Sequence, residues 1–248
     1  MKSLRFAISI LTTIPVGHIE NIDRKVWLKS VYFSPLCGYF IASLSVLPLI
    51  AVTKTFYIPD IIQAIIIVAS LFLFTGGLHL DGLADACDSF LCTTHRDRRV
   101  EIMIDSRIGT FGAAGLVLLI TAKIAAVFIL VSVKNYFAIF AIIVLARFLM
   151  IVLIKFGHYF PYNVGGMGQD IIGKISYTTL TTTLIYTAPC FIFSRDIFIT
   201  AIILLAMVLF LNKRSNDKIG GISGDVLGAS CELSEALGFV LLTIKPYQ

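Results

Sequence analysis

The sequence contains few charged residues for its length. Asp, Glu, Lys and Arg make up 14% of its 248 residues, whereas 58% are hydrophobic and the mean hydropathy is +0.93. Because a soluble domain carries about 25% charged residues, this composition excludes a soluble globular protein. We also expect no separate soluble module. We interpret residues 1–248 as a single integral membrane domain.

The sequence also lacks paired cysteines and a signal-peptide cleavage site. The five cysteines do not have the paired spacing of a metal site, and isolated cysteines in apolar sequence are usually buried as small hydrophobic residues rather than joined in disulfides. The N-terminal stretch MKSLRFAISILTTIPV has a short apolar run without the small-residue cleavage site of a signal peptide. We therefore expect this stretch to form a short interfacial helix.

The apolar runs predict an all-α fold, a polytopic membrane helical bundle. At roughly 20 residues per span the chain has room for about seven transmembrane helices, within a range of about six to eight. The predicted spans are residues 33–52, 61–80, 109–133, 136–156, 177–194, 197–211 and 225–244.

One acidic stretch interrupts this apolar pattern. In TGGLHLDGLADACD, residues 75–88, the aspartates Asp81, Asp85 and Asp88 follow one another at steps of four and three. On an α-helix this spacing places them on one face, where like charges repel unless they are neutralised. The glycines Gly76, Gly77 and Gly82 weaken a helix but would let a ligand approach the backbone closely.

A divalent cation is the natural partner for this face. Mg2+ prefers oxygen ligands and leaves coordination positions for substrate phosphates, so we expect Asp81, Asp85 and Asp88 to hold Mg2+. A solvated acidic turn is the alternative interpretation. Phosphoryl transfer also needs a group that accepts the proton of an attacking hydroxyl, and our candidates for this catalytic role are Asp88 first and Asp85 second.

The long polar segment after these aspartates supplies further candidates. Arg99 and Arg107 could bind phosphate oxygens in the bidentate manner typical of arginine, although such a cluster can also be a solvated loop. Together with His79, Glu101 and Asp105 they form our predicted substrate-binding set in this part of the chain. His79 can equally be an interfacial histidine without a ligand.

Charged residues inside the predicted spans are rare and need a reason. Lys123 and Arg147 lie within two spans, where they could contact an anion, snorkel or form a structural ion pair. Asp225, Glu232 and Glu235 lie in the last span at steps of seven and three, roughly on one helix face. We expect these acids to bind substrate, either through a second metal or through a sugar.

The distribution of basic residues predicts the topology. With the N-terminus in the cytoplasm, fourteen of the 20 Lys and Arg residues fall on the cytoplasmic side, four fall on the opposite side and two lie within spans. The acidic stretch, the arginine-rich segment, the glycine loop around Gly166 and the segment GGISGDVLGA would then share the cytoplasmic face. A transporter would instead show polar features along a path across the bilayer, so the one-sided polarity favours an enzyme.

Three motifs carry a specific resemblance to a known family. In order and spacing, TGGLHLDGLADACD, then EIMIDSRIGTFGAAGLVL from Glu101, then GDVLGASCELSE from Gly224 resemble the cobalamin synthase family, the membrane adenosylcobinamide-GDP ribazoletransferases. The opening FAISILTTIPV and residues 32–38 also resemble the start of that family. The likeness covers nearly the whole chain.

The resemblance implies a reaction. Adenosylcobinamide-GDP and α-ribazole, or its 5′-phosphate, would give adenosylcobalamin, or its 5′-phosphate, and GMP, with Mg2+ as the cofactor. It also implies a multi-pass protein of the bacterial or archaeal cytoplasmic (inner) membrane whose active site faces the cytoplasm. We expect membrane lipid as a partner, no nucleic acid, and allow for a homo-oligomer.

Two alternatives stay open. A CDP-alcohol phosphotransferase uses a similar carboxylate pattern, D-G-x2-A-R, but the segment that begins with Asp81 and Gly82 lacks the arginine of that pattern. A corrinoid or metal transporter belongs to a different class of protein and would move its substrate across the bilayer without releasing GMP.

Overall fold

The computed structural model describes residues 1–105, 107–160, 167–192 and 194–244. Within these residues the fold is helical, and the β contact it shows is one isolated bridge between Tyr159 and Ile222. The all-α prediction is therefore confirmed. The glycine loop around Gly166 lies largely outside the described residues.

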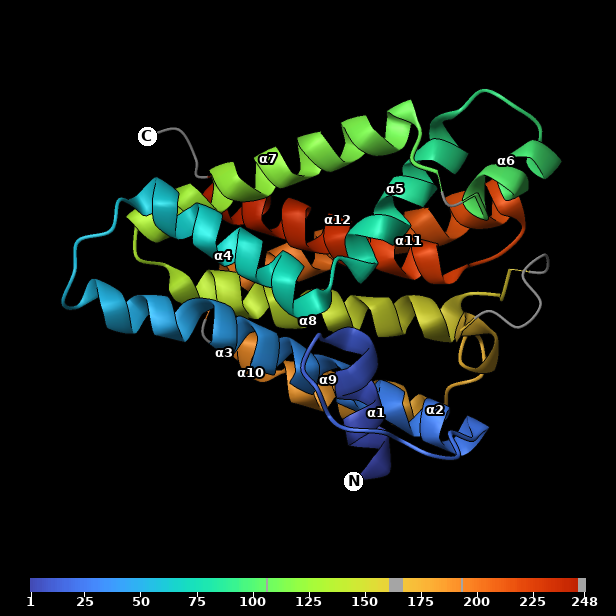
Figure 1. Cartoon of the computed structure of the whole chain (residues 1–248), viewed down its shortest axis with the longest axis horizontal. Coiled ribbons are helices and arrows are strands. Elements are labelled where there is room, and N and C mark those ends of the chain that lie inside the picture. The colour runs from blue at the N-terminus through green and yellow to red at the C-terminus, as the bar shows by residue number, and fades with distance from the viewer. Residues whose placement is uncertain (106, 161–166, 193, 245–248) are drawn as a thin grey trace.

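Figure 1 shows how the helices follow one another along the chain. They are α1 (Lys2–Leu11), α2 (Arg24–Ser30), the 3-10 helix η1 (Val31–Phe33), α3 (Ser34–Thr53), α4 (Asp60–Thr75), α5 (Leu78–Leu91), α6 (Arg96–Met103), α7 (Thr110–Ser132), α8 (Tyr136–Phe156), the 3-10 helix η2 (Met167–Asp170), α9 (Tyr177–Thr187), α10 (Pro189–Ile192), α11 (Arg195–Ile219) and α12 (Gly224–Thr243).

The described residues contain five helical stretches long and apolar enough to cross a membrane. These are Arg24–Thr53, Thr110–Ser132, Tyr136–Phe156, Arg195–Ile219 and Gly224–Thr243, and α4 with α5 would make a sixth if the bent pair is one span. The protein is thus a multi-pass membrane helical bundle, but the expected count of seven is not confirmed. The predicted span 177–194 is divided into α9, of 11 residues, and α10, of 4 residues, and α10 begins at Pro189, which lacks the N–H needed to continue a helix.

The predicted span 61–80 is wrong, because the helix breaks within it. Helix α4 ends at Thr75, and Gly76 and Gly77 follow with φ angles of 63° and 70°. Glycine adopts this left-handed conformation without the steric penalty of a side chain. The chain consequently turns by 91° between α4 and α5, and in Figure 1 α5 rises steeply away from the long, nearly horizontal helices.

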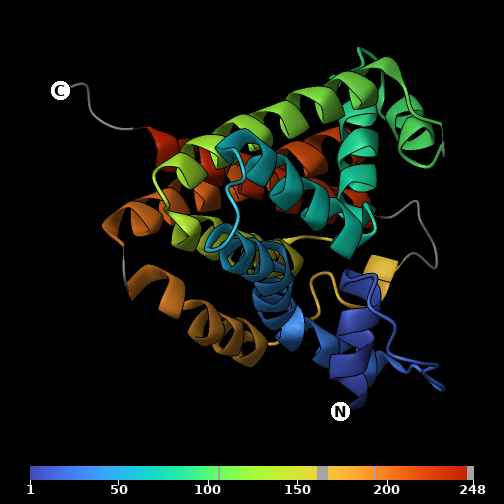
Figure 2. The same ribbon diagram turned by 60° about the vertical axis from the view of Figure 1, so that its left-hand side comes forward.

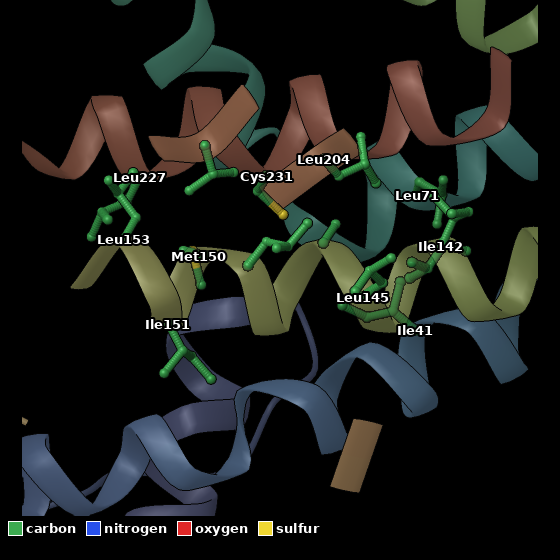
Figure 3. Packing of buried hydrophobic residues seen from close by; sticks show 14 of the residues in the cluster. Ile41, Leu71, Ile142, Leu145, Met150, Ile151, Leu153, Leu204, Leu227 and Cys231 are labelled. Carbon is green, nitrogen blue, oxygen red and sulfur yellow. The ribbon is translucent and has the colours of Figure 1, made fainter. Parts of the chain in front are cut away.

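Helix α8 forms the centre of the bundle and packs against α3 on one side and α12 on the other (Figure 3). Ile142, Leu145 and Met150 of α8 belong to one buried cluster with Ile41 of α3 and Cys231 of α12. Because lipid tails are as apolar as these side chains, close van der Waals packing holds the helices together. All five cysteines are free, as expected.

The N-terminal helix α1 is confirmed and covers one flank of the bundle. It packs on α2 and on the start of α3, far from α7 (Figure 2). Phe6 of α1 meets Trp27 of α2 edge to face, with 4.8 Å between the ring centroids and an interplanar angle of 87°. These contacts attach the N-terminal segment to the bundle.

Several polar segments gather at one end of the bundle. The Arg96 guanidinium donates to the Asn216 carbonyl at 2.9 Å, and the Lys218 ammonium donates to the Phe90 carbonyl at 3.0 Å. The Ile222 N–H donates to the His158 carbonyl at 2.7 Å. The segment after α5, the end of α11 and the segment after α8 therefore meet, as their shared side in the predicted topology requires.

Helices α5 and α12 cross with their backbones in contact. A Cβ atom added at Gly82 would lie 2.7 Å from the Asp225 Cα atom, and one added at Gly228 would lie 3.1 Å from the His79 Cα atom. We expected Gly82 to open the backbone to a ligand, but α12 occupies that space. The glycines therefore set how closely the two helices approach.

We predict that Gly82→Ala destabilises the protein. Its methyl group would force α5 and α12 apart, and overpacking of this kind costs about 1–3 kcal/mol. Gly224→Ala is the matched control, because a Cβ atom there meets nothing within 4 Å. Thermal unfolding in detergent should show a lower midpoint for Gly82→Ala alone; equal midpoints for the two variants would contradict the prediction.

Candidate active site

The three aspartates of α5 differ in exposure although they share one helix. Asp81 is exposed, Asp85 is half-buried and Asp88 is buried. Asp81 borders two cavities, and Asp85 borders the larger of them. The helix thus presents its first two carboxylates to open space and its third to the protein interior.

Asp88 binds the start of α7. Its carboxylate accepts hydrogen bonds from the Gly109 N–H at 2.7 Å and from the Gly112 N–H at 2.9 Å. Gly109 is the N-cap of α7 and has no side chain with which to satisfy these N–H groups. Asp88 therefore supplies the cap from 21 residues earlier in the chain, and a Cβ at either glycine would collide with its carboxylate.

This contact changes the ranking of the two candidate bases. Both Asp88 oxygen atoms already accept backbone N–H groups at the start of α7. A base or a metal ligand at this position would compete with these bonds. We had placed Asp88 first and Asp85 second, and the geometry favours Asp85.

Asp225 joins Asp81 and Asp85 from the other helix of the crossing. It lies in the first turn of α12, where Ser223 donates to its carboxylate at 3.1 Å. Negative charges act on Asp85 from Asp225 most strongly, and then from Asp81, Asp88 and Asp105. The carboxylates of Asp81, Asp85 and Asp225 thus come from two helices and repel one another.

The chemistry of this donor set fits a magnesium ion. Among the described residues, no group of three or more His, Cys, Asp or Glu side chains is placed so that it could hold a metal ion. Mg2+ is commonly bound through one or two carboxylates, water and substrate phosphates rather than an all-protein cage. Asp81, Asp85 and Asp225 offer carboxylate ligands of this kind.

Two cavities meet at Asp81. The larger, of about 740 Å³, lies between α4, α5 and α7 and includes Asp85, Lys123 and Glu232 among its lining residues. The smaller, of about 150 Å³, lies among α1, α2, α5, α8 and α12 and includes His79 and Asp225. Both have mainly apolar walls, and Asp81 is the charged residue that lines both of them. We call Asp81, Asp85 and Asp225 together the acidic cluster.

The other acids of α12 are held in a buried ion-pair cluster. The Lys123 ammonium lies 2.6 Å from the Glu232 carboxylate and 2.5 Å from the Glu235 carboxylate, and Arg147 pairs with Glu235. All four side chains are at most 6% exposed. Of the roles left open for Lys123 and Arg147, the structure shows the ion pair.

This cluster divides the predicted set of α12 acids. Glu232 lies two helical turns beyond Asp225, about 10.5 Å along the axis, and pairs there with Lys123 of α7. Glu235 is enclosed with its two cations. Of the three α12 acids, Asp225 is the one that lies at the acidic cluster.

The Arg99 side chain also forms its hydrogen bonds inside the protein. Its guanidinium donates to the carbonyl groups of Ser89, Phe90 and Thr94, at 2.7, 3.0 and 3.1 Å. The Ser89 hydroxyl donates in turn to the Arg99 carbonyl at 2.9 Å. The side chain that we expected on a phosphate therefore satisfies the carbonyl groups at the end of α5.

The remaining candidates lie in exposed pairs. Glu101 is 2.6 Å from Arg98, and Arg107 binds the Asp105 carboxylate with its closest contact at 2.7 Å. The Arg107 hydrogen bonds lower the pKa of Asp105 to about 2, so this carboxyl is ionised at neutral pH. Their predicted contact with substrate stays a prediction.

The model of the cobalamin-5-phosphate synthase family matches residues 3–243. The chain belongs to this family. Three curated relatives, each named adenosylcobinamide-GDP ribazoletransferase, are 30% identical to it. The relatives from Clostridioides difficile, Klebsiella pneumoniae and Clostridium botulinum cover 98%, 98% and 95% of this chain and 97%, 99% and 94% of their own lengths. No solved structure gives a significant match.

Sequence reasoning located the acidic helix of this family member but missed the partners of its residues. Helical spacing identifies which residues share a face, whereas the capping of α7 by Asp88 and the pairing of Lys123 with two glutamates join distant segments. The sequence did contain a signal for the Asp88 cap, because a helix that starts at glycine has no side-chain cap of its own. It also contained a signal for the ion pairs, because two cations and two acids lie inside apolar spans.

We predict that Asp85→Asn and Asp88→Asn separate catalysis from structure. Asp85→Asn should abolish turnover and leave the thermal unfolding midpoint near that of the unmodified protein. Asp88→Asn should lower the midpoint, because an amide cannot accept both N–H groups as a carboxylate does and losing a charged hydrogen bond costs about 1.5–3 kcal/mol. Turnover and unfolding measured on both variants check this; the opposite pattern would restore Asp88 as the base.

We also predict that Glu235→Gln is strongly destabilising. It leaves Lys123 and Arg147 with one carboxylate between them, and breaking a buried ion pair costs about 3–5 kcal/mol. Glu101→Gln is the control, since it removes the exposed pair with Arg98 and should change little. Thermal unfolding measured for both variants tests this prediction. Similar midpoints would show that the buried cluster does not stabilise the fold.

Proposed function

We propose that this protein is an adenosylcobinamide-GDP ribazoletransferase, the activity in the names of its relatives. Membership of the cobalamin-5-phosphate synthase family is the observation that carries the proposal. The geometry supports it, because a carboxylate cluster between two cavities suits an enzyme that joins two substrates at a phosphate. The products would be adenosylcobalamin, or its 5′-phosphate, and GMP.

We propose that Asp81 and Asp225 hold Mg2+, which leaves the Asp85 carboxylate free to accept a proton. When bound, the ion would neutralise the negative charge of the diphosphate. The chain positions the carboxylates through the α5–α12 crossing, and Ser223 orients Asp225 by its hydrogen bond. In phosphoryl transfer, positioning and charge neutralisation account for most of the catalysis.

Asp85 is our proposed general base. In the reaction, the 3′-hydroxyl oxygen of α-ribazole forms a bond to the phosphorus nearer cobinamide. The bond from that phosphorus to the bridging oxygen breaks, and GMP leaves with the electron pair. The hydroxyl proton passes to the Asp85 carboxylate, whose half-buried position beside the larger cavity gives it access to substrate.

We propose that this site faces the cytoplasm of a bacterial or archaeal inner membrane. Basic residues such as Arg96 and Lys218 lie where the polar segments meet at one end of the bundle, and basic residues are typical of the cytoplasmic side. The family match favours the ribazoletransferase over a CDP-alcohol phosphotransferase or a transporter.

The purified protein, given adenosylcobinamide-GDP, α-ribazole and Mg2+, should release GMP. Chelating Mg2+ should stop the reaction and adding it back should restore the rate. Asp81→Asn should lower turnover at least about 100-fold, since even residues around a metal's ligands cost 10–100-fold when changed. Asp97→Asn, an exposed residue of α6 with no proposed role, is the control.

Two results would contradict this function. Transport of substrate into proteoliposomes without GMP release would identify a transporter, and product formation from diacylglycerol instead of α-ribazole would identify a lipid phosphotransferase. Near-normal turnover of Asp81→Asn would remove Asp81 from the metal site.

A further inference from the structure

The smaller cavity has features of a site for a flat aromatic ring. Its walls include the apolar side chains of Ala7, Ile10, Met150 and Ile151. An apolar cavity of about 150 Å³ is large enough for benzene, and this one also continues toward Asp81 and Asp225. A ring with a polar group attached would therefore fit with that group directed at the acidic cluster.

An aromatic side chain forms part of the wall. Trp27 lines the cavity, and its edge-to-face contact with Phe6 fixes the plane of the indole ring. Aromatic rings attract one another in offset-stacked and edge-to-face arrangements beyond the gain from buried area. The wall thus favours an aromatic ligand over an aliphatic one.

Two buried polar atoms in this lining have no hydrogen-bond partner among the described residues. They are Nδ1 of His79, a side chain 3% exposed, and the hydroxyl oxygen of Ser34, a side chain 2% exposed. A buried polar atom without a hydrogen bond is costly. A ligand that supplies one or two hydrogen-bonding atoms would remove this cost.

These features discriminate between the rings of the two substrates. Guanine presents several donors and acceptors along one edge, and each would need a partner when buried. The benzimidazole of α-ribazole is apolar apart from the ring nitrogen not bonded to ribose, which accepts one hydrogen bond. Apolar walls, one indole and a single histidine match the second ring.

We propose that the cavity among α1, α2, α5, α8 and α12 binds the benzimidazole ring of α-ribazole, with Trp27 against the ring and His79 donating to its free nitrogen. This assignment rests on the proposed function. The ribose would then extend toward Asp81 and Asp225, which border the same cavity. The N-terminal helices α1 and α2 consequently form part of the substrate site.

The protein contains a probe at this position, because Trp27 is its single tryptophan. Titrating the full-length protein with α-ribazole, without the second substrate, should quench Trp27 fluorescence in a saturable manner. Guanosine diphosphate should not. No quenching by α-ribazole, or equal quenching by both compounds, would overturn the proposal whether or not the protein is active.

Filling the cavity should block the ring. Ala7→Phe adds a side chain that occupies the space, and the KM for α-ribazole should rise about tenfold or more, as overpacking predicts. The KM for adenosylcobinamide-GDP should change little. Ala125→Phe, at an exposed position of α7 that lines neither cavity, should leave the KM for α-ribazole unchanged.

His79 provides a second pair of variants that does not depend on Ala7→Phe folding. His79→Leu should weaken α-ribazole binding in the fluorescence titration relative to the unmodified protein. His79→Asn, whose amide nitrogen lies near the place of Nδ1, should bind α-ribazole much more tightly than His79→Leu. If GMP is released but neither the KM nor the titration responds to these variants, the ring site is wrong and the proposed function stands. If α-ribazole binds with the predicted pattern but no GMP forms, the reaction is wrong and the ring site stands.

Discussion

Gly82 of α5 and Gly228 of α12 let these helices cross with their backbones in contact, and the arrangement of the acidic cluster depends on that crossing. It places Asp225 beside Asp81 and Asp85, which are distant from it in the sequence. The 91° turn at Gly76 and Gly77 makes the crossing accessible, because it directs α5 out of the line of α4 and toward α12. Small residues therefore determine the distances between carboxylates whose charges repel.

Away from the crossing, α12 is fixed by charges of opposite sign. Glu232 and Glu235 pair with Lys123 of α7 and Arg147 of α8, and the two cations and two anions leave the group neutral. Desolvating charges is costly, so the cluster contributes less net stability than the removal of one of its members would cost. It fixes the rotation of α12 about its axis, and this rotation directs Asp225 at α5.

The sequence was sufficient to predict what depends on local pattern. The apolar runs gave the bundle and the boundaries of α8, and helical spacing gave Asp81 and Asp85 on one face. Features that join distant segments could not be predicted. The capping of Gly109 by Asp88 and the use of Arg99 for the end of α5 depend on which helices become neighbours, because the same polar side chains would suit a ligand equally well.

The position of Asp81 between two cavities bears on how two substrates can react. In phosphoryl transfer the attacking and leaving oxygens lie roughly in line through phosphorus. The nucleophile therefore reaches the phosphorus from the side opposite the leaving group. A single cleft would bring both substrates from one side and would demand a large rearrangement. Here α1, α2 and α8 form the walls of one cavity and α4 and α7 those of the other, with the carboxylates of α5 at their junction. The 91° bend between α4 and α5 places Asp81 where it borders both cavities, as the approach of two substrates to one phosphorus in our proposal requires.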